Sequence, residues 1–152
     1  MGEQVRKVLL LICAVVLMAG CTQKKEAKWL FVLHSLDAEM SATELKMTDP
    51  DRYVLAFTDR PERKTAMIPI ADFVKNWPES FDKKNTKASI AYFDEQHKYY
   101  DAALELADPE IKENSLVFKI KALDKAEPGK LGEAALFIDP TDQMCCIYNI
   151  SK

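Results

Sequence analysis

Residues 116–123 read Leu-Val-Phe-Lys-Ile-Lys-Ala-Leu, and this alternating run decides the fold class. Leu116, Phe118 and Ile120 fall on one side of an extended chain, and the two lysines of the run fall on the other. Successive side chains of a strand point to opposite faces. The run therefore predicts a half-buried β-strand with one face in a hydrophobic core.

Further segments on both sides of this run also predict strands, because they are rich in β-branched and aromatic residues and are bounded by turn residues. They are residues 29–33, 43–48, 52–58, 88–93, 97–106 and 134–138, with residues 64–68 as a short additional extended piece. A turn at residues 49–51 predicts that the two strands beside it form a hairpin. A turn at residues 108–110 predicts the end of the strand before it. The alanine-rich residues 101–107 leave a helix open as an alternative.

One amphipathic helix is predicted over residues 69–78. Its apolar face, at the spacing of a helix, consists of Ile70, Phe73, Val74 and Trp77. Pro69 suits the first helical turn, and Pro78 is expected to end the helix. Strands and helices do not alternate along the chain. We therefore predict a mainly β protein, an antiparallel β-sandwich or barrel-like domain with one short helix.

The first 20 residues have the features of a secretory signal, since Arg6 and Lys7 precede an apolar run. The run is too short to span a bilayer, which takes about 20 residues. Residues 17–21 read Leu-Met-Ala-Gly-Cys and resemble the lipobox of bacterial lipoproteins. The resemblance implies that Cys21 carries a diacylglyceryl group, that cleavage follows before Cys21, and that acyl chains such as palmitate anchor the protein. An ordinary signal peptide cut nearby and an uncleaved anchor remain the alternatives.

These features divide the chain into four parts. We expect a lipoprotein signal peptide at residues 1–20, a lipidated tether at 21–28, a single β-rich domain at 29–139 and a C-terminal tail at 140–152. Removal of the signal leaves 132 of the 152 residues, which is enough for one domain with a substantial core.

The charge of the chain limits its partners. The net charge is −3, and the first 20 residues contribute +1, so the remainder carries about −4. Binding to nucleic acid depends on Lys and Arg neutralising phosphates, so nucleic acid is excluded as a partner. Membrane contact is expected only through the anchor at Cys21, which places the protein in the bacterial cell envelope. Thr22, rather than aspartate, follows Cys21 and predicts the outer membrane, facing the periplasm, in a Gram-negative host.

The most unusual local sequence is Asp-Arg-Pro-Glu-Arg at residues 59–63. Arg60 and Arg63 offer two guanidinium groups, which suit a carboxylate or phosphate, and Asp59 is placed to orient one of them. The alternative is a turn in which Asp59 and the arginines only pair with each other and with strand ends. Because proline restricts the residue before it, Arg60 is expected to point inward and Arg63 toward solvent.

This sequence also carries a resemblance. Residues 57–63 read Phe-Thr-Asp-Arg-Pro-Glu-Arg, and Phe73, Trp77, Leu-x-Leu-x-x-Pro at 104–109 and Leu-Phe-Ile-Asp at 136–139 follow. Together they resemble a family of small exported bacterial proteins with an F-[ST]-D-R-P-x-R signature. The resemblance covers most of residues 29–139. The family has no assigned activity, so the resemblance implies that residues 57–63 matter but transfers no catalytic residues.

The other reactive side chains do not form a recognisable site. His34, Ser35 and Asp37 are too close in sequence to build a hydrolase triad. The segment Asp94–His97 is more simply a turn than a metal site. Cys145 and Cys146 lack the Cys-x-x-Cys spacing of a redox dithiol, which leaves intermolecular pairing, a strained vicinal disulfide or two buried thiols. We predict no catalytic residues, no metal site and no cofactor.

The sequence favours an envelope-anchored lipoprotein that acts as a binding or assembly module for an unknown ligand, with an envelope protein as a candidate partner. The alternative is an enzyme of unknown reaction with a site near the loop Asp59–Arg63.

Overall fold

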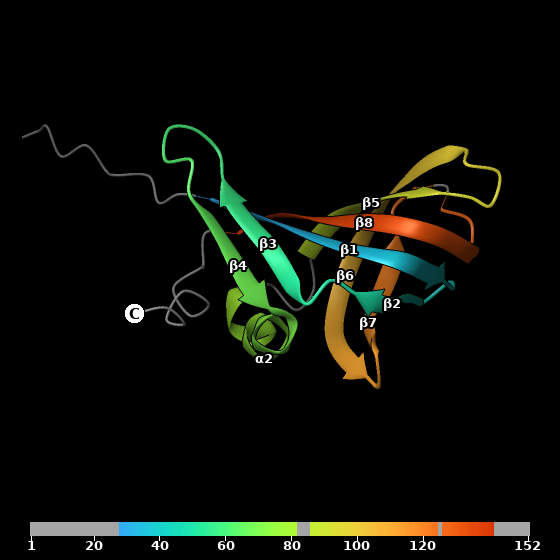
Figure 1. Ribbon diagram of the computed structural model, residues 1–152, viewed down its shortest axis with the longest axis horizontal. Helices are drawn as coiled ribbons and strands as arrows, with labels where there is room; N and C mark the ends of the chain where they lie inside the picture. The colour runs from blue at the N-terminus through green and yellow to red at the C-terminus, as the bar shows by residue number, and fades with distance from the viewer. Residues whose placement is uncertain (1–27, 82–85, 125, 142–152) are drawn as a thin grey trace, which may run out of the picture.

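Eight strands and one helix make up the part of the chain that the computed structural model describes, residues 28–81, 86–124 and 126–141 (Figure 1). The elements are β1 (Trp29–Met40), β2 (Glu44–Pro50), β3 (Tyr53–Thr58), β4 (Thr65–Pro69), α2 (Ile70–Ser80), β5 (Thr86–Phe93), β6 (Tyr99–Lys112), β7 (Ser115–Ala122) and β8 (Gly129–Thr141). The predicted class, mainly antiparallel β with a single short helix, is confirmed.

Six of the strands close into a barrel. Hydrogen bonds connect them in the order β2-β7-β6-β5-β8-β1, and β1 then pairs with β2. Every neighbouring pair is antiparallel. Closure pairs backbone groups that would otherwise lie at open sheet edges. Of the sandwich and barrel-like alternatives, the chain adopts the barrel.

Strand β1 changes its partner halfway along its length. Its first residues, Trp29 to Val32, pair with β3, whereas the residues from Ser35 onward pair with β2. At the junction the backbone amide of Asp51 donates a 2.9 Å hydrogen bond to the carbonyl of His34. Strands β3 and β4 therefore extend the sheet beyond the barrel, with β4 at its edge. We call this pair of strands the extension.

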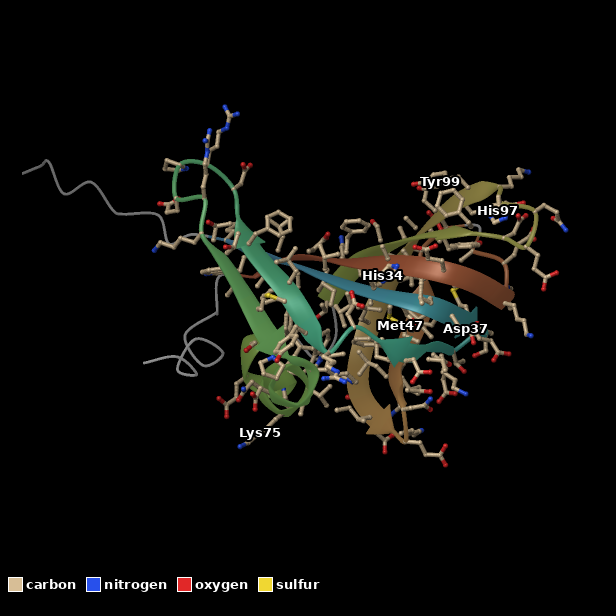
Figure 2. The ribbon with its side chains drawn as sticks, viewed as in Figure 1. His34, Asp37, Met47, Lys75, His97 and Tyr99 are labelled. Carbon is tan, nitrogen blue, oxygen red and sulfur yellow. The ribbon has the colours of Figure 1, made fainter. Side chains whose placement is uncertain are left out.

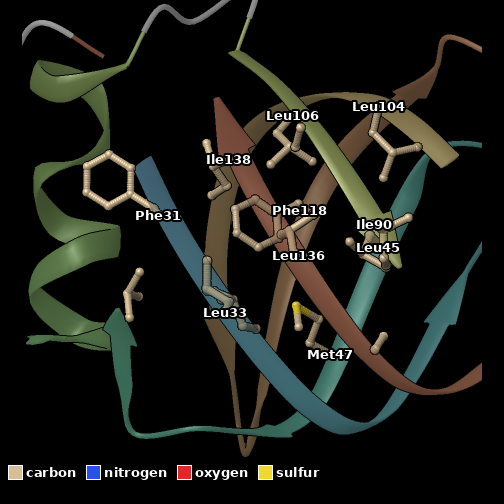
Figure 3. Close-up of a cluster of buried hydrophobic side chains, with 14 of the residues drawn as sticks. Phe31, Leu33, Leu45, Met47, Ile90, Leu104, Leu106, Phe118, Leu136 and Ile138 are labelled. Atoms are coloured by element: carbon tan, nitrogen blue, oxygen red, sulfur yellow. The ribbon is translucent and has the colours of Figure 1, made fainter. Parts of the chain in front are cut away.

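The barrel interior is filled by apolar side chains that alternate along each strand (Figure 3). On β7, the run that predicted the fold, Leu116, Phe118 and Ile120 are buried while Lys119 and Lys121 are exposed. Facing strands contribute the remaining buried side chains, including Leu33, Leu45, Met47, Ile90, Leu104, Leu136 and Ile138.

Helix α2 covers the inner face of the extension. Its buried residues Phe73 and Trp77 pack in an aromatic cluster with Phe31, Phe81 and Phe118. The Trp77 ring stacks on Phe81 at 4.2 Å and meets Phe118 edge-on at 5.7 Å. The expected burial of the apolar helix face is thus confirmed. Phe31 belongs to β1 and Phe118 to β7, so the cluster joins the helix to the barrel.

The end of the helix differs from the prediction. The helix continues through Pro78 to Ser80, so Pro78 does not stop it. The amide of Phe81 donates a 3.0 Å hydrogen bond to the carbonyl of Trp77 and closes the last turn. A proline this near the end removes only one helical hydrogen bond, and burial of Trp77 and Phe81 holds the turn in place.

Two strand predictions are wrong. The strands on either side of the 49–51 turn do not form a hairpin, because β2 pairs with β1 and β7 while β3 pairs with β1 and β4. The turn predicted at residues 108–110 is a bulge within β6, marked by a register shift between Ala107 and Glu110 and a positive φ of 44° at Asp108. The helical alternative for residues 101–107 is excluded, since β6 pairs with strands on both sides.

Candidate functional site

The predicted site residues occupy the loop that connects β3 to β4, at residues 59–64 (Figure 1). Thr58 fixes both ends of this loop. Its backbone amide donates to the carbonyl of Lys64 at 2.9 Å, and its hydroxyl accepts the amide of Lys64 at 2.9 Å. Because Thr58 is itself buried, its hydrogen bonds to Lys64 attach the loop to the core.

Asp59 organises the loop through its backbone neighbours. Its Oδ1 accepts the amide of Arg60 at 2.7 Å, and its carbonyl accepts the amide of Arg63 at 3.2 Å. Arg63 has a positive φ of 47°, and the Arg60–Pro61 peptide bond is cis. The carboxylate is thus used to shape the turn, whereas the sequence suggested that it orients a guanidinium group.

Both arginine side chains are exposed. The expectation that Arg60 points inward is wrong, because the loop extends beyond the strands and offers no interior at that position. No ion pair between described residues involves Asp59, Arg60 or Arg63. Two guanidinium groups therefore lie close together in sequence on a short loop that leaves their donors accessible.

The loop lies at the same end of the protein as the start of β1. Trp29 pairs with Thr58 in the β1–β3 register, so the chain enters the fold next to the loop. Figure 2 shows His97 and Tyr99 at the far end of the molecule, on the β5–β6 hairpin. The arginine loop and this hairpin therefore occupy opposite ends.

The residues His34, Ser35 and Asp37 do not converge. Ser35 is buried, and its hydroxyl lies 2.7 Å from the carbonyl of Asp37 and 2.5 Å from that of Thr48. His34 faces outward, as adjacent strand residues must. These three side chains form no triad, which agrees with the argument from sequence spacing.

His34 instead lies between two carboxylates. Its Nε2 is 3.1 Å from Glu133 and its Nδ1 is 3.6 Å from Asp51. The cluster joins β1, β8 and the β2–β3 turn on the outer surface. The sequence does not predict this cluster, because Glu133 lies 99 residues from His34 and nothing in the local sequence connects them.

The segment Asp94–His97 forms the turn of the β5–β6 hairpin. The Asp94 carboxylate accepts the amides of Gln96 and Lys98, both at 2.9 Å. The hydrogen bond from Lys98 is the largest cause that lowers the pKa of Asp94. His97 has a positive φ of 59°. Within the described ranges, no three His, Cys, Asp or Glu residues are grouped to hold a metal ion.

The aromatic residues of this hairpin pack across the strands. Tyr92 stacks on Tyr100 at 5.4 Å, and Phe93 meets Tyr99 edge-on at 5.9 Å. Burial is the largest cause that raises the pKa of Tyr92. Tyr99 and Tyr100 therefore pack against residues of the neighbouring strand.

Cys21, Cys145 and Cys146 lie outside the described residues, so the predictions for lipidation and for the vicinal thiols remain predictions. Among the residues that are described, no helix is long and apolar enough to cross a membrane. Comparison of the chain with known protein families, with curated proteins and with solved structures finds no match.

Proposed function

We propose that this chain is an envelope-anchored lipoprotein whose barrel is a non-enzymatic binding or assembly module, and that the loop Asp59–Arg63 binds an anionic group of its ligand. The observation that carries the proposal is the exposure of Arg60 and Arg63 on a loop held by Thr58 and Lys64. A loop with fixed ends loses less conformational entropy when it binds, which favours recognition.

The chemistry of the loop favours a carboxylate or a phosphate. A guanidinium group presents a planar set of donors that matches either anion with two parallel hydrogen bonds. The carboxylate of Asp59 is engaged with the amide of Arg60. It therefore leaves the guanidinium donors to a ligand.

The place of the loop fits a membrane anchor. The predicted tether, residues 21–28, leads to the first strand, and eight residues span at most about 28 Å. The pairing of Trp29 with Thr58 puts the loop beside this entry point. Lipidation at Cys21 would hold the loop near the membrane surface, where both lipid-linked and protein-borne anions are found.

Titration of the purified full chain with inorganic phosphate, and separately with acetate, tests the binding. The melting temperature is followed for the wild type, Arg60→Lys and Arg63→Lys. A ligand at ten times its Kd adds about 1.4 kcal/mol of stability. We expect the wild type to gain stability with at least one anion and both lysine variants to lose most of that gain.

Arg52→Lys is the matched control, because Arg52 is an exposed arginine in the β2–β3 turn, outside the loop. Sodium chloride at equal ionic strength controls for screening. An equal gain in all three arginine variants, or no gain in the wild type with either anion, overturns the proposed anion site.

A further inference from the structure

The outer face of the sheet is apolar and exposed where β4, β3, β1 and β8 lie side by side. Its central row consists of Met67, Leu55, Val32 and Phe137, which are neighbours through the pairs Leu55–Met67, Leu55–Val32 and Val32–Phe137. The side chains of Met67, Leu55 and Phe137 are exposed by 68%, 44% and 45%. The flanking pair Leu30–Phe57 is half-buried on the same face. We call these six residues the outer apolar face.

The arrangement of the sheet explains why helix α2 does not cover this face. Strand residues alternate between faces, and the neighbours Phe31, Val54 and Ala56 point to the opposite side, where they are buried. Helix α2 packs on that opposite side through Phe73, which lies 5.8 Å from Phe31. Single exposed apolar residues are ordinary, but a contiguous row across four strands indicates a surface that is covered by something.

The chain also has an apolar stretch of sequence that follows the end of β8, beside this face. Residues 142–152 read Asp-Gln-Met-Cys-Cys-Ile-Tyr-Asn-Ile-Ser-Lys, with apolar side chains at Met144, Cys145, Cys146, Ile147, Tyr148 and Ile150. They follow Thr141, the last residue of β8, which pairs with Trp29 at the start of β1. We call residues 142–152 the C-terminal segment.

The geometry allows the two to meet. From Trp29 to Val32 along β1 is about 10 Å, and from β8 to β3 across the sheet is about 10 Å, by standard strand dimensions. Eleven residues span up to about 38 Å when extended. The C-terminal segment is therefore long enough to cross the whole outer apolar face.

We propose that the C-terminal segment folds back over the outer apolar face and buries Leu55, Phe137 and its own two thiols there. Both surfaces are apolar, and each removes the other from water. Reduced cysteine is among the residue types most often buried, which suits Cys145 and Cys146 to this role. An attached segment has an effective concentration of the order of millimolar, so it occupies the face ahead of a second copy of the chain.

Disulfide trapping tests the proposal in the full chain. Leu55→Cys places a thiol on the outer apolar face, with Cys13 and Cys21 replaced by serine and only one of Cys145 and Cys146 kept at a time. A mild oxidant such as diamide converts two thiols within reach to a disulfide and is itself reduced. We expect an intramolecular disulfide between residue 55 and residue 145 or 146, identified by mass spectrometry of the digested monomer.

Tyr99→Cys is the matched control, because Tyr99 is also exposed but lies at the opposite end of the molecule (Figure 2). We expect at least a tenfold lower yield of intramolecular disulfide for this variant. An equal yield at both positions overturns the proposal. Disulfide-linked dimers through residue 55 overturn it as well, because they assign the face to a second copy, and so does the absence of any crosslink at residue 55.

A second measurement uses substitutions that lie outside the barrel. Replacing Ile147, Tyr148 and Ile150 with serine removes the apolar side chains of the segment, and Asn149→Ala with Ser151→Ala is the control. We expect fluorescence of the dye ANS to rise at least twofold in the first variant only, since the outer apolar face is then bare. Equal fluorescence in the two variants contradicts the proposal even if a cysteine variant fails to fold.

Discussion

Trp29, the first residue of β1, pairs with Thr58, the last residue of β3. This pair places the loop Asp59–Arg63 beside the point where the chain enters the fold. Thr58 also binds Lys64 through its amide and its hydroxyl, so the same residue holds both ends of the loop. The start of β1 at Trp29 and the loop that follows Thr58 consequently lie at one end of the protein.

Trp77→Ala is expected to destabilise the protein by about 3–5 kcal/mol. The ring is buried between Phe73, Phe81 and Phe118, and an eleven-residue helix does not persist without such packing. Urea denaturation measures the loss. Lys75→Ala, on the exposed side of the same helix, is the control and is expected to change stability by less than about 0.5 kcal/mol (Figure 2). A loss below about 1 kcal/mol for Trp77→Ala contradicts its place in the core.

Gly132→Ala is expected to cost about 2 kcal/mol. Gly132 has a positive φ of 66°, and a Cβ there lies 3.0 Å from the carbonyl oxygen of Phe93. The backbone atom cannot yield as a flexible side chain can, so strain adds to the clash. Thermal melting compares this variant with Lys130→Ala, an exposed change in the same strand. Similar melting temperatures for the two variants would show that β8 has a different backbone at this position.

Asp94→Asn is expected to weaken stability near pH 7 and not in acid. The hydrogen bonds from the amides of Lys98 and Gln96 lower the pKa of Asp94 in the folded state. The carboxylate therefore stabilises the fold above the pKa of the unfolded chain, about 3.9, and this contribution is lost as the pH falls through the folded-state pKa.

The test is chemical denaturation of the wild type and of Asp94→Asn across that range. The asparagine oxygen still accepts hydrogen bonds, so the variant removes mainly the charge. The difference in unfolding free energy should shrink below pH 4 (about the unfolded value). Glu95→Gln removes a charge from the same turn and serves as the control. A difference that stays constant with pH would rule out the charge as its cause.

Cys21→Ser is expected to release the protein from membranes. After removal of the first 20 residues the chain carries a net charge of about −4, so anionic lipid does not attract it. Under the proposed lipidation, the acyl chains on Cys21 attach the protein to the membrane. Fractionation after a salt wash measures it, with Cys13→Ser as the control. Retention of the Cys21→Ser protein in the membrane fraction would reveal a second attachment.

Local alternation was enough to locate most of the strands. Leu116, Phe118 and Ile120 are buried as their spacing predicts, and the apolar positions of α2 pack on the core. The order of the strands in the sheet could not be predicted from this alternation. Nothing in residues 29–40 indicates that β1 leaves β3 for β2 near His34, because that exchange depends on strands from distant parts of the chain.

The errors have identifiable causes. A turn signature such as Asp108-Pro109 also fits a bulge, and pairing with β7 carries β6 through it. The loop sequence drew attention to Asp59, Arg60 and Arg63, but the direction of Arg60 depends on how far the loop extends beyond the strands. His34, Asp51 and Glu133 meet only after folding.

The proposal that the loop Asp59–Arg63 binds an anion is tested most directly with Arg63→Lys, whose melting temperature and complementation in the native host are both measured. Lysine keeps the charge but loses the paired donors of the guanidinium group. Arg63 is exposed and forms no ion pair among the described residues, so the melting temperature of the Arg63→Lys protein should stay within about 1 °C of the wild-type value. We expect this stable protein to fail to complement a deletion of its gene. Full complementation by the stable variant would contradict an anion-binding role for the loop Asp59–Arg63.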